Sequence, residues 1–513
     1  MIATEGPQVS VALFYLPVKM NFDRRWSLME WAKLLSIKRV GELMGKEKSK
    51  DDSRTPFERD YGRAVFSTPV RRLQDKTQVF PLEEHDAVRT RLTHSLEVSS
   101  VARNLGRQVG IWLQGKGLIG TDQIHDIETI AATCGLIHDL GNPPFGHSGE
   151  TAIQSWFESK LSAEQIPAKS GKARGNSGLF EGLGTPDKKG RYESQYASDF
   201  LKWEGNAQTL RLISRLQVLA DEYGINLTCA TFSAAMKYVS RSNDLAEKDG
   251  PHEKSKPGFF ASENETVKSV QKETGTVGIR HPITYLVEAS DDIVYATGDL
   301  EDGVRKGILH WEFLKRELKT RSGGSQLVER VIGDAEKKVG FDRKRPHLLN
   351  EEVTQAFRTF SIGEMKDAAF AQFCRSYKDV RDGRYHGEIV RDEDCEAATF
   401  VQACTGIGVD YVYPSPPTLK LELMGRRVIH DLMNLFWEGA RVCGAGDAPK
   451  ECKKGFAGKA FKLISSNYKN VFLSTLKKGK LPERYCRLQL VTDQIAGMTD
   501  SFAMRLHKLL MNG

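Results

Sequence analysis

The chain has 513 residues, of which 40% are hydrophobic and 27% are charged, so it is long enough to bury a sizeable core in two or three lobes. No apolar run reaches the roughly 18 residues of a membrane-spanning helix, which argues against a membrane protein. The formal net charge of +7, from 74 Lys and Arg against 67 Asp and Glu, favours an anionic partner such as a nucleotide or a nucleic acid without proving either.

The start of the chain and its cysteines predict a cytoplasmic protein. The apolar stretch at residues 9–18 is interrupted by Ser10 and Pro17 and lacks the form of a signal peptide. The eight cysteines contain no Cys-x-x-Cys pair, so neither a disulfide framework nor a thiolate zinc cluster is indicated. We therefore expect reduced thiols.

Residues 1–50 form a lead with an amphipathic segment at 24–43, and a predicted catalytic core follows over residues 51–305. Apolar positions from Thr90 onward recur at helical spacing, which places His94 in the first turns of a long helix. A second helix should end before residues 141–144 (GNPP), because glycine favours a left-handed cap and proline cannot continue the hydrogen bonding. The Gly-rich and Lys-rich stretch near residues 168–192 predicts a flexible flap.

The rest of the chain is also predicted to be helical. Residues 306–513 form a helical C-terminal region, which is a candidate for oligomerisation and for DNA contact. Strand signals are short and occur at residues 78–81 and 411–413. The predicted fold class is all-α, with a helical core, additional C-terminal helices and at most small β elements. Helical periodicity is found at residues 207–219, 283–300, 352–373, 421–439 and 488–511.

One His-Asp pair stands out among the four that the sequence contains. His138 and Asp139 lie at a predicted helix end, and a tight turn brings another His and a Glu back toward them (residues 135–150, GLIHDLGNPPFGHSGE). Together with His94 upstream and Asp291 downstream, they would form a mixed nitrogen and oxygen donor set. Such a set suits Mn²⁺, Fe²⁺, Ni²⁺ or Mg²⁺ better than structural zinc and leaves positions open for water and phosphate.

The order of these residues resembles the HD superfamily of metal-dependent phosphohydrolases, and the surrounding words resemble the bacterial deoxyguanosine triphosphate triphosphohydrolases. The resemblance runs from about residue 54 to residue 302 and returns weakly at 491–502 (VTDQIAGMTDSF). The matching words are residues 71–74 (RRLQ), 78–82 (QVFPL), 89–95 (RTRLTHS), 138–147 (HDLGNPPFGH), 204–208 (EGNAQ) and 288–293 (EASDDI).

The resemblance implies the metal ligands and the catalytic pair. The ligands would be His94, His138, Asp139 and Asp291, holding Mg²⁺ or Mn²⁺, with Fe²⁺, Ni²⁺ and Co²⁺ as alternatives. His147 would be the catalytic general acid or base, and Glu150 its orienting carboxylate. Family members cleave the bond between the 5′ oxygen and the α-phosphorus and release deoxynucleoside and triphosphate. Because a 5′-alkoxide leaves poorly unless it is protonated, a histidine that titrates near neutral pH is the natural acid.

The resemblance also implies substrate contacts. Tyr295 and Asp299 follow Asp291 at i+4 and i+8, on one helical face, and would meet the deoxyribose, with the Tyr295 ring excluding a ribose 2′-hydroxyl. Gln78 would bind the 3′-hydroxyl and Arg91 a phosphate. The residues expected to clamp the triphosphate or line the same pocket are Lys237, Tyr238, Lys256 and Asn206.

Several alternatives stay open at this point. By spacing alone Asp292 is as good a ligand as Asp291, Glu150 would also suit a helix N-terminus, and the lysines are compatible with solvated surface positions. The preferred activity is dGTP hydrolysis; the alternatives are an HD phosphohydrolase with other nucleotide substrates and a nucleotide-sensing, DNA-binding regulator. The family resemblance further predicts a homo-oligomer, a hexamer by analogy, and single-stranded DNA as a candidate activator that the C-terminal lysines would bind.

Overall fold

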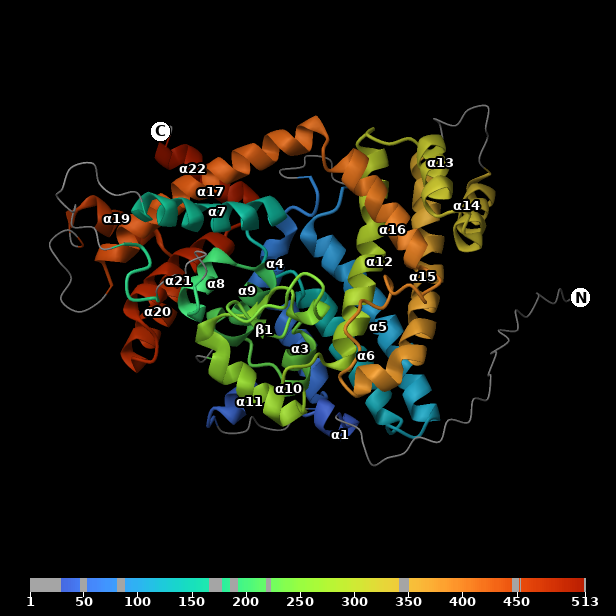
Figure 1. The fold of residues 1–513 in the computed structure, drawn as a ribbon, viewed down its shortest axis with the longest axis horizontal. Coiled ribbons are helices and arrows are strands. Elements are labelled where there is room, and N and C mark those ends of the chain that lie inside the picture. The colour runs from blue at the N-terminus through green and yellow to red at the C-terminus, as the bar shows by residue number, and fades with distance from the viewer. Residues whose placement is uncertain are drawn as a thin grey trace, which may run out of the picture.

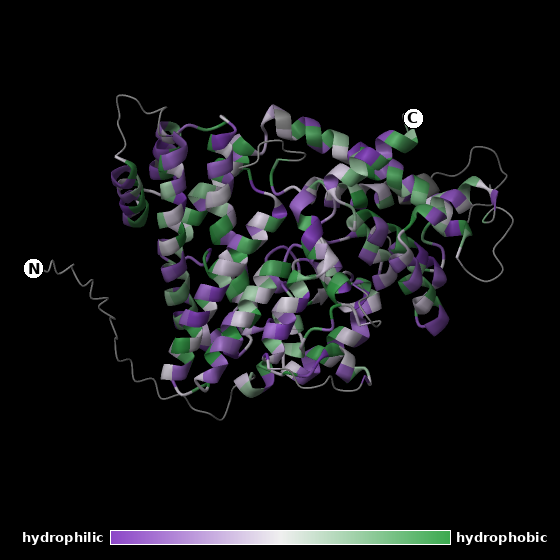
Figure 2. Cartoon of the chain, turned by 180° about the vertical axis from the view of Figure 1, so that it is seen from behind, coloured by the Kyte–Doolittle hydropathy of each residue, from purple (hydrophilic) through white to green (hydrophobic). Residues whose placement is uncertain are grey.

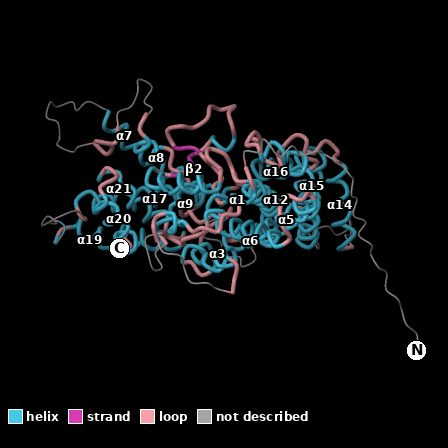
Figure 3. Tube along the Cα trace, turned by 90° about the horizontal axis from the view of Figure 1, so that it is seen from below, coloured by secondary structure: helices cyan, strands magenta, loops and turns pink. Residues whose placement is uncertain are grey.

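Helices provide nearly all the regular structure of the part of the chain that the computed structural model describes (Figures 1 and 3). The only sheet among these residues is a parallel pair of short strands, β1 (Ser240–Arg241) and β2 (Pro257–Phe259). The predicted all-α class is therefore confirmed. The described residues are 29–46, 53–80, 88–165, 178–184, 192–217, 223–340, 350–444, 452 and 454–511. Much of the predicted lead and most of the flap thus lie outside the described residues.

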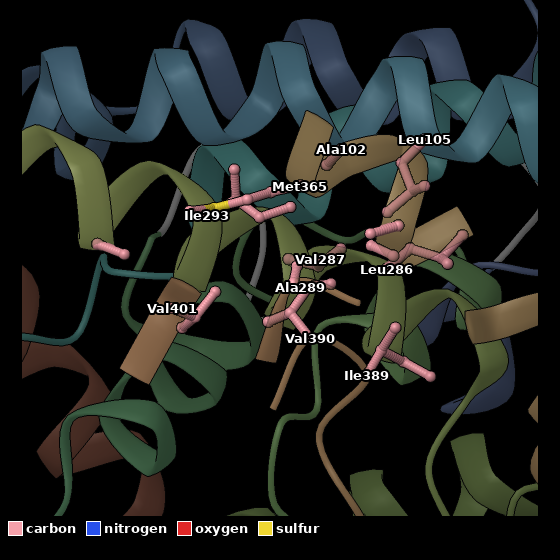
Figure 4. Packing of buried hydrophobic residues seen from close by; sticks show 14 of the residues in the cluster. Ala102, Leu105, Leu286, Val287, Ala289, Ile293, Met365, Ile389, Val390 and Val401 are labelled. Carbon is pink, nitrogen blue, oxygen red and sulfur yellow. The ribbon is translucent and has the colours of Figure 1, made fainter. Parts of the chain in front are cut away.

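Long helices pack side by side around one apolar cluster (Figure 1). Thr90 caps the first of them through a reciprocal capping box with Thr93, and Pro282 starts another because its missing N–H needs no partner at the first helical position. Leu105 and Ile293 both belong to this cluster, in which Ile293 lies beside Met365 and Leu105 beside Leu286 (Figure 4). The long helices are α5 (Arg91–Gly115), α6 (Asp122–Ile137), α12 (Pro282–Arg305) and α15 (Asn350–Arg381).

A second apolar cluster joins the middle of the chain to its C-terminal end. The helix α7 (Gly146–Gln165) packs against α17 (Pro416–Val442), which in turn packs against α21 (Glu483–Ala496) and α22 (Asp500–Met511). Polar and apolar positions alternate along most helices, as expected where one face is buried (Figure 2). Both clusters contain residues from either side of position 305, and the domain division at that position stays a prediction.

The remaining helices complete the two halves, with α13 to α16 at one end of the molecule and α19 to α21 at the other (Figures 1 and 3). Their bounds are α1 (Trp31–Leu34), α2 (Val40–Leu43), α3 (Pro56–Val65), α4 (Thr68–Arg72), α8 (Gln195–Leu201), α9 (Gly205–Arg211), α10 (Cys229–Ala234), α11 (Asn264–Thr274), α13 (Trp311–Arg321), α14 (Gln326–Val339), α16 (Ala398–Ile407), α19 (Phe456–Leu463) and α20 (Ser466–Lys478). None of the described helices combines the length and the apolar character needed to span a bilayer.

Three local predictions were wrong. Residues 78–80 follow a single bridge between Thr77 and Thr90 and are bends, while residue 81 lies outside the described residues. Residues 411 and 412 end a π-helical turn (Gly408–Val412) and Tyr413 follows it, because short β-prone runs without a partner strand do not form a sheet. The periodic stretch at 488–511 is two helices, separated at Gly497.

The expectation of reduced thiols was also wrong for one pair. Cys443 at the end of α17 and Cys452 before α19 form a disulfide, with their Cα atoms 5.5 Å apart. The other six cysteines are free thiols, and most of them are buried.

A buried ion pair holds the N-terminal segment on the core and yields a stability prediction. Asp60 accepts from Arg39 at 2.7 Å, from the Thr228 backbone N–H at 2.9 Å and from the Thr228 hydroxyl at 2.7 Å, and both charged side chains are buried. Asp60→Ala would leave the Arg39 charge buried without its partner, so it should lower the free energy of unfolding by about 3–5 kcal/mol in urea denaturation. The matched control is Asp379→Ala, which breaks an exposed pair with Arg384 and should leave stability almost unchanged.

Candidate active site

A tight turn between α6 and α7 carries the His-Asp pair into the interior. His138 follows the last residue of α6, and Gly141 lies so close to α9 that a Cβ at this position would stand 2.1 Å from the carbonyl oxygen of Gly205. The Gly141 N–H donates to the Thr209 hydroxyl at 2.9 Å, and that hydroxyl donates to the His138 carbonyl at 3.2 Å. Only glycine allows this approach, which locks the turn against the start of α9.

Three side chains from different helices converge beyond this turn. The donor atoms of His94, His138 and Asp291 lie within 4.8 Å of one another. Asp291 Oδ1 lies 3.0 Å from His94 Nε2 and 3.5 Å from His138 Nε2. His138 Nδ1 donates to the Gly135 carbonyl at 2.7 Å, so Nε2 points into the cluster, where it is buried without a hydrogen-bond partner. Two imidazoles and a carboxylate around an unsatisfied buried nitrogen fit a divalent cation.

The two neighbouring aspartates of α12 have different partners. Asp291 faces the histidines, whereas Asp292 binds Arg391 at 2.8 Å. Burial raises the pKa of Asp292 to about 6 despite this pairing. The structure therefore places Asp291, and not Asp292, in the cluster.

Asp139 lies at the edge of the same cluster. It is 3.5 Å from His138 Nε2, and its carboxylate accepts from Arg91 and, at 2.7 Å, from the Asn142 amide. Although burial opposes the shift, the charges of His138 and Arg91 hold the pKa of Asp139 well below its usual range. The carboxylate is thus ionised at neutral pH, as a metal ligand requires.

The cluster opens onto a cavity of about 440 Å³. His147 and Glu150 enter it from α7, where a spacing of three residues places them on one face. Desolvation by the surrounding protein and the charge of Arg91 lower the pKa of His147, whereas burial and the charge of Glu204 raise that of Glu150. The predicted site residues that line the cavity are Gln78, Arg91, His138, Asp139, His147, Glu150, Asn206, Lys237, Tyr238, Lys256, Asp291 and Tyr295.

Cations face the cavity from several elements, each beside a carboxylate. Lys237 Nζ lies 3.7 Å from Glu288, and Lys256 Nζ lies 3.5 Å from Glu204. Burial lowers the pKa of Lys237, but the negative charge of Glu288 raises it by more. The net shift is upward, so this lysine is charged at neutral pH.

Two predicted site residues lie behind the cavity wall. His94 is 2% exposed and does not line the cavity, although its donor atom belongs to the cluster with His138 and Asp291. Asp299 is buried, and its carboxylate lies 2.6 Å from the hydroxyl of Tyr413, which is also 2.5 Å from the hydroxyl of Tyr295. Burial raises the pKa of Asp299 to about 7. Asp299 thus orients the two tyrosines that line the cavity.

Comparisons with known proteins agree with this arrangement. A family model described as HD domain matches residues 91–176, and one described as Phosphohydrolase-associated domain matches residues 469–509. A curated protein of Listeria monocytogenes serovar 1/2a, named deoxyguanosinetriphosphate triphosphohydrolase-like protein, is 34% identical over 486 residues, covering 94% of this chain and 99% of its own. The chain belongs to the deoxyguanosinetriphosphate triphosphohydrolase family.

A second relative carries the same name without the ending "-like protein". The deoxyguanosinetriphosphate triphosphohydrolase of Yersinia pseudotuberculosis serotype O:3 is 32% identical over 484 residues, covering 89% of this chain and 93% of the relative. The family resemblance predicted from the motifs is thereby confirmed. The family similarity also includes much of the stretch at 305–485, in which no word was recognised.

The cavity of this family member is also lined by residues that the sequence did not assign to the site, among them Tyr413, Arg391 and Glu204. Tyr413 was predicted to be part of a strand, and its position directly after a π-helical turn and three residues before α17 gives no spacing signal. Arg391 lies in an irregular segment without a motif. Glu204 opens a word that was recognised, EGNAQ, and its carboxylate accepts from the Asn206 backbone N–H at 2.5 Å. Of these three, only Glu204 could have been found from the sequence.

The different surroundings of Asp291 and Asp292 make a direct test of metal binding. Loss of an outer-shell partner commonly lowers metal affinity about 10- to 100-fold, so loss of a donor in Asp291→Asn should lower Mn²⁺ affinity at least about 100-fold. The neighbouring Asp292→Asn should stay within about tenfold of the parent protein. Titration calorimetry with Mn²⁺ alone measures both; equal losses in the two variants would contradict the placement.

Proposed function

We propose that this protein hydrolyses dGTP to deoxyguanosine and inorganic triphosphate. The observation that carries the proposal is the His94, His138 and Asp291 cluster at a cavity that Lys237 and Lys256 also line. A cation site and basic side chains in one cavity suit a polyphosphate. The cation can act at the phosphorus that is attacked while the lysines neutralise the charge of the other phosphates of the same ligand. The printed names of the Listeria and Yersinia relatives support dGTP as the nucleotide.

The metal would be held by His94, His138 and Asp291, with Asp139 beside them, and Mg²⁺ or Mn²⁺ is proposed ahead of Fe²⁺, Ni²⁺ or Co²⁺. When bound, a divalent cation polarises a phosphoryl oxygen and lowers the pKa of a coordinated water. The protein supplies the orientation: the hydrogen bond from His138 Nδ1 to Gly135 fixes that imidazole with Nε2 inward.

Different residues of the chain would bind different parts of the substrate. Lys237, Tyr238 and Lys256 would bind the triphosphate, while Arg91, already bound to Asp139, would contact a phosphate without leaving that carboxylate. Tyr295, oriented by Asp299 through Tyr413, would pack against the deoxyribose.

Two amides would complete the pocket. Gln78 would bind the 3′-hydroxyl. The Asn206 side-chain amide already donates to Glu204 at 3.1 Å, so it would line the pocket through its remaining oxygen.

His147 would donate the proton that the departing 5′ oxygen needs. Its imidazole is exposed to the cavity at the start of α7, next to the basic groups that lower its pKa. The negative charge of a bound triphosphate would favour the imidazolium and raise that pKa, so that the acid form appears with the substrate. Glu150, on the same helical face, would orient His147.

The other partners and the location stay predictions. We retain the homo-oligomer, the hexamer by analogy, single-stranded DNA as an activator and the cytoplasm as the place of action.

Analysis of the reaction products tests the proposed function. Incubation with dGTP and Mg²⁺ or Mn²⁺ should release intact triphosphate and deoxyguanosine in equal amounts, resolved by anion-exchange and reversed-phase chromatography. GTP should be turned over more slowly, because its 2′-hydroxyl would collide with the Tyr295 ring. Stepwise release of phosphate or pyrophosphate would contradict the reaction, and faster turnover of another dNTP would contradict the choice of guanine.

The charge state of His147 predicts a pH profile. An acid loses activity as pH rises through its pKa, and the pKa of His147 in the free protein is below its ordinary value. The alkaline fall of kcat/KM, which reports the free protein, should therefore lie at lower pH than that of kcat, which reports the complex. His147→Ala should lower kcat about 10²- to 10⁴-fold and abolish the alkaline fall of kcat. The assignment is wrong if that variant keeps the parent profile.

A further inference from the structure

Two segments that border the candidate active site are tied to one buried carboxylate near the C-terminus. Asp500, the first residue of α22, is 2% exposed and does not line the cavity. Its Oδ1 accepts from the backbone N–H of Phe145 at 3.0 Å, and its Oδ2 accepts from the backbone N–H of Thr77 at 3.0 Å and from the Thr77 hydroxyl. Thr77 precedes Gln78, and Phe145 lies two residues before His147.

We propose that Asp500 is a positioning residue of the hydrolytic reaction, which fixes His147 and Gln78 relative to each other without touching the substrate. The inference rests on the proposed function, since it assumes that His147 acts on the substrate. It gives a role to the sequence word at 491–502, which the assignment of metal and substrate contacts left without one.

The backbone at Phe145 explains why the turn needs an external partner. Phe145 has a φ of 66°, in the left-handed region that a side chain with a Cβ rarely adopts, and Gly146 follows with a φ of 58°. Such a turn persists only where its surroundings hold it. Asp500 binds the N–H of the residue with this unfavourable conformation. Because α7 starts at Gly146, the same bond sets the direction in which His147 leaves the turn.

A second C-terminal helix, α17, contacts the same turn. The Phe145 ring packs on α17 so tightly that a Cβ on Gly425 would stand 2.7 Å from its Cγ. The ring and the N–H of Phe145 are therefore held by α17 and α22, respectively, while Gly146 faces the Arg91 guanidinium, whose Nη2 would be 2.8 Å from an added Cβ. The turn is thus confined on three sides.

The junction between α21 and α22 binds the same region through a further residue. Lys76, which precedes Thr77, donates to the Ala496 carbonyl at 2.8 Å and to the Asn142 carbonyl. Asn142 in turn holds Asp139. A lysine and an aspartate, adjacent in space, therefore link the end of α21 and the start of α22 to both segments of the site.

The chemistry of the carboxylate is specific to this role. Both oxygens of Asp500 face N–H donors, so each must be an acceptor. In Asp500→Asn, which has the same shape, one oxygen becomes an NH₂ group that meets an N–H donor, and one of the two segments loses its bond. A misplacement of about 1 Å can lower a rate about 100-fold.

The decisive experiment is a double-mutant cycle between Asp500→Asn and His147→Ala, run with whichever dNTP the parent enzyme hydrolyses fastest. Asp500→Asn alone should lower kcat about 10- to 100-fold, and its effect should be clearly smaller when His147 is already Ala, because only the placement of Gln78 is then left to lose. An equal loss in both backgrounds, or no loss in the parent, would overturn the proposal. A substrate other than dGTP would contradict the proposed function but not this inference.

The matched control is Ser501→Ala, which removes a hydrogen bond of 2.8 Å from the same helix to Asp75 and should leave kcat within about twofold. Mn²⁺ affinity should be unchanged in both variants, because Asp500 touches none of the three donors of the cluster. NMR titration of the His147 ring gives a readout that needs no turnover. Release of the turn from Arg91 should raise the pKa of His147 in Asp500→Asn and not in Ser501→Ala; an unchanged pKa in both would contradict the proposal.

If Asp500→Asn does not fold, Gly425→Ala tests the same turn through its contact with the Phe145 ring. Its added methyl would displace the Phe145 ring without altering Asp500, so kcat should fall in the presence of His147 and not in the His147→Ala background. A variant with the parent kcat, or with the same loss in both backgrounds, would overturn the proposal.

Discussion

The candidate active site depends on the contact between the turn after α6 and the first turn of α9. Gly141 approaches the Gly205 carbonyl so closely that no side chain fits between them. This contact fixes His138 and Asp139 on one segment relative to Glu204 and Asn206 on the other, although more than 60 residues separate them. Since α5 and α12 pack against α6, the same contact determines where His94 and Asp291 must lie to meet His138.

Charge balance explains how such a site stays folded before a polyanion binds. The cavity contains several acids, and the cations beside them are already paired: Arg91 with Asp139, Lys237 with Glu288, Lys256 with Glu204 and Arg391 with Asp292. The lysine pairs, at 3.7 and 3.5 Å, are long, whereas Arg91 binds Asp139 closely. A triphosphate would therefore draw the lysines away at little cost and leave Arg91 in place. The net charge of the whole chain does not predict this local arrangement, because the fold brings basic and acidic side chains from distant parts of the sequence to one cavity.

The sequence was most informative where chemistry requires a residue type at a fixed position in a helix. The setting of His138 and Asp139 at a helix end was predicted correctly, because Pro143 cannot continue the helix, although Gly141 does not adopt the left-handed conformation expected of a cap. The choice between Asp291 and Asp292 needed the structure, because adjacent residues point to different sides of a helix and spacing alone cannot say which side meets the histidines. Tyr413 and Arg391 could not have been found, since their approach to the cavity depends on long-range packing.

The same limit explains why the C-terminal helices carried so little signal. Their apolar periodicity predicts helices but not their partners, and two of the residues that tie them to the site are single buried acids. Asp493 on α21 binds Arg211 at the end of α9, at 2.7 and 2.6 Å, and Asp500 on α22 binds the turn before α7. Each of these acids lies in the 491–502 word, and each holds a helix that begins at the site. Burying a carboxylate is unfavourable unless its oxygens are hydrogen-bonded, so each of these acids can be buried only while the segment of the site that it binds is in place.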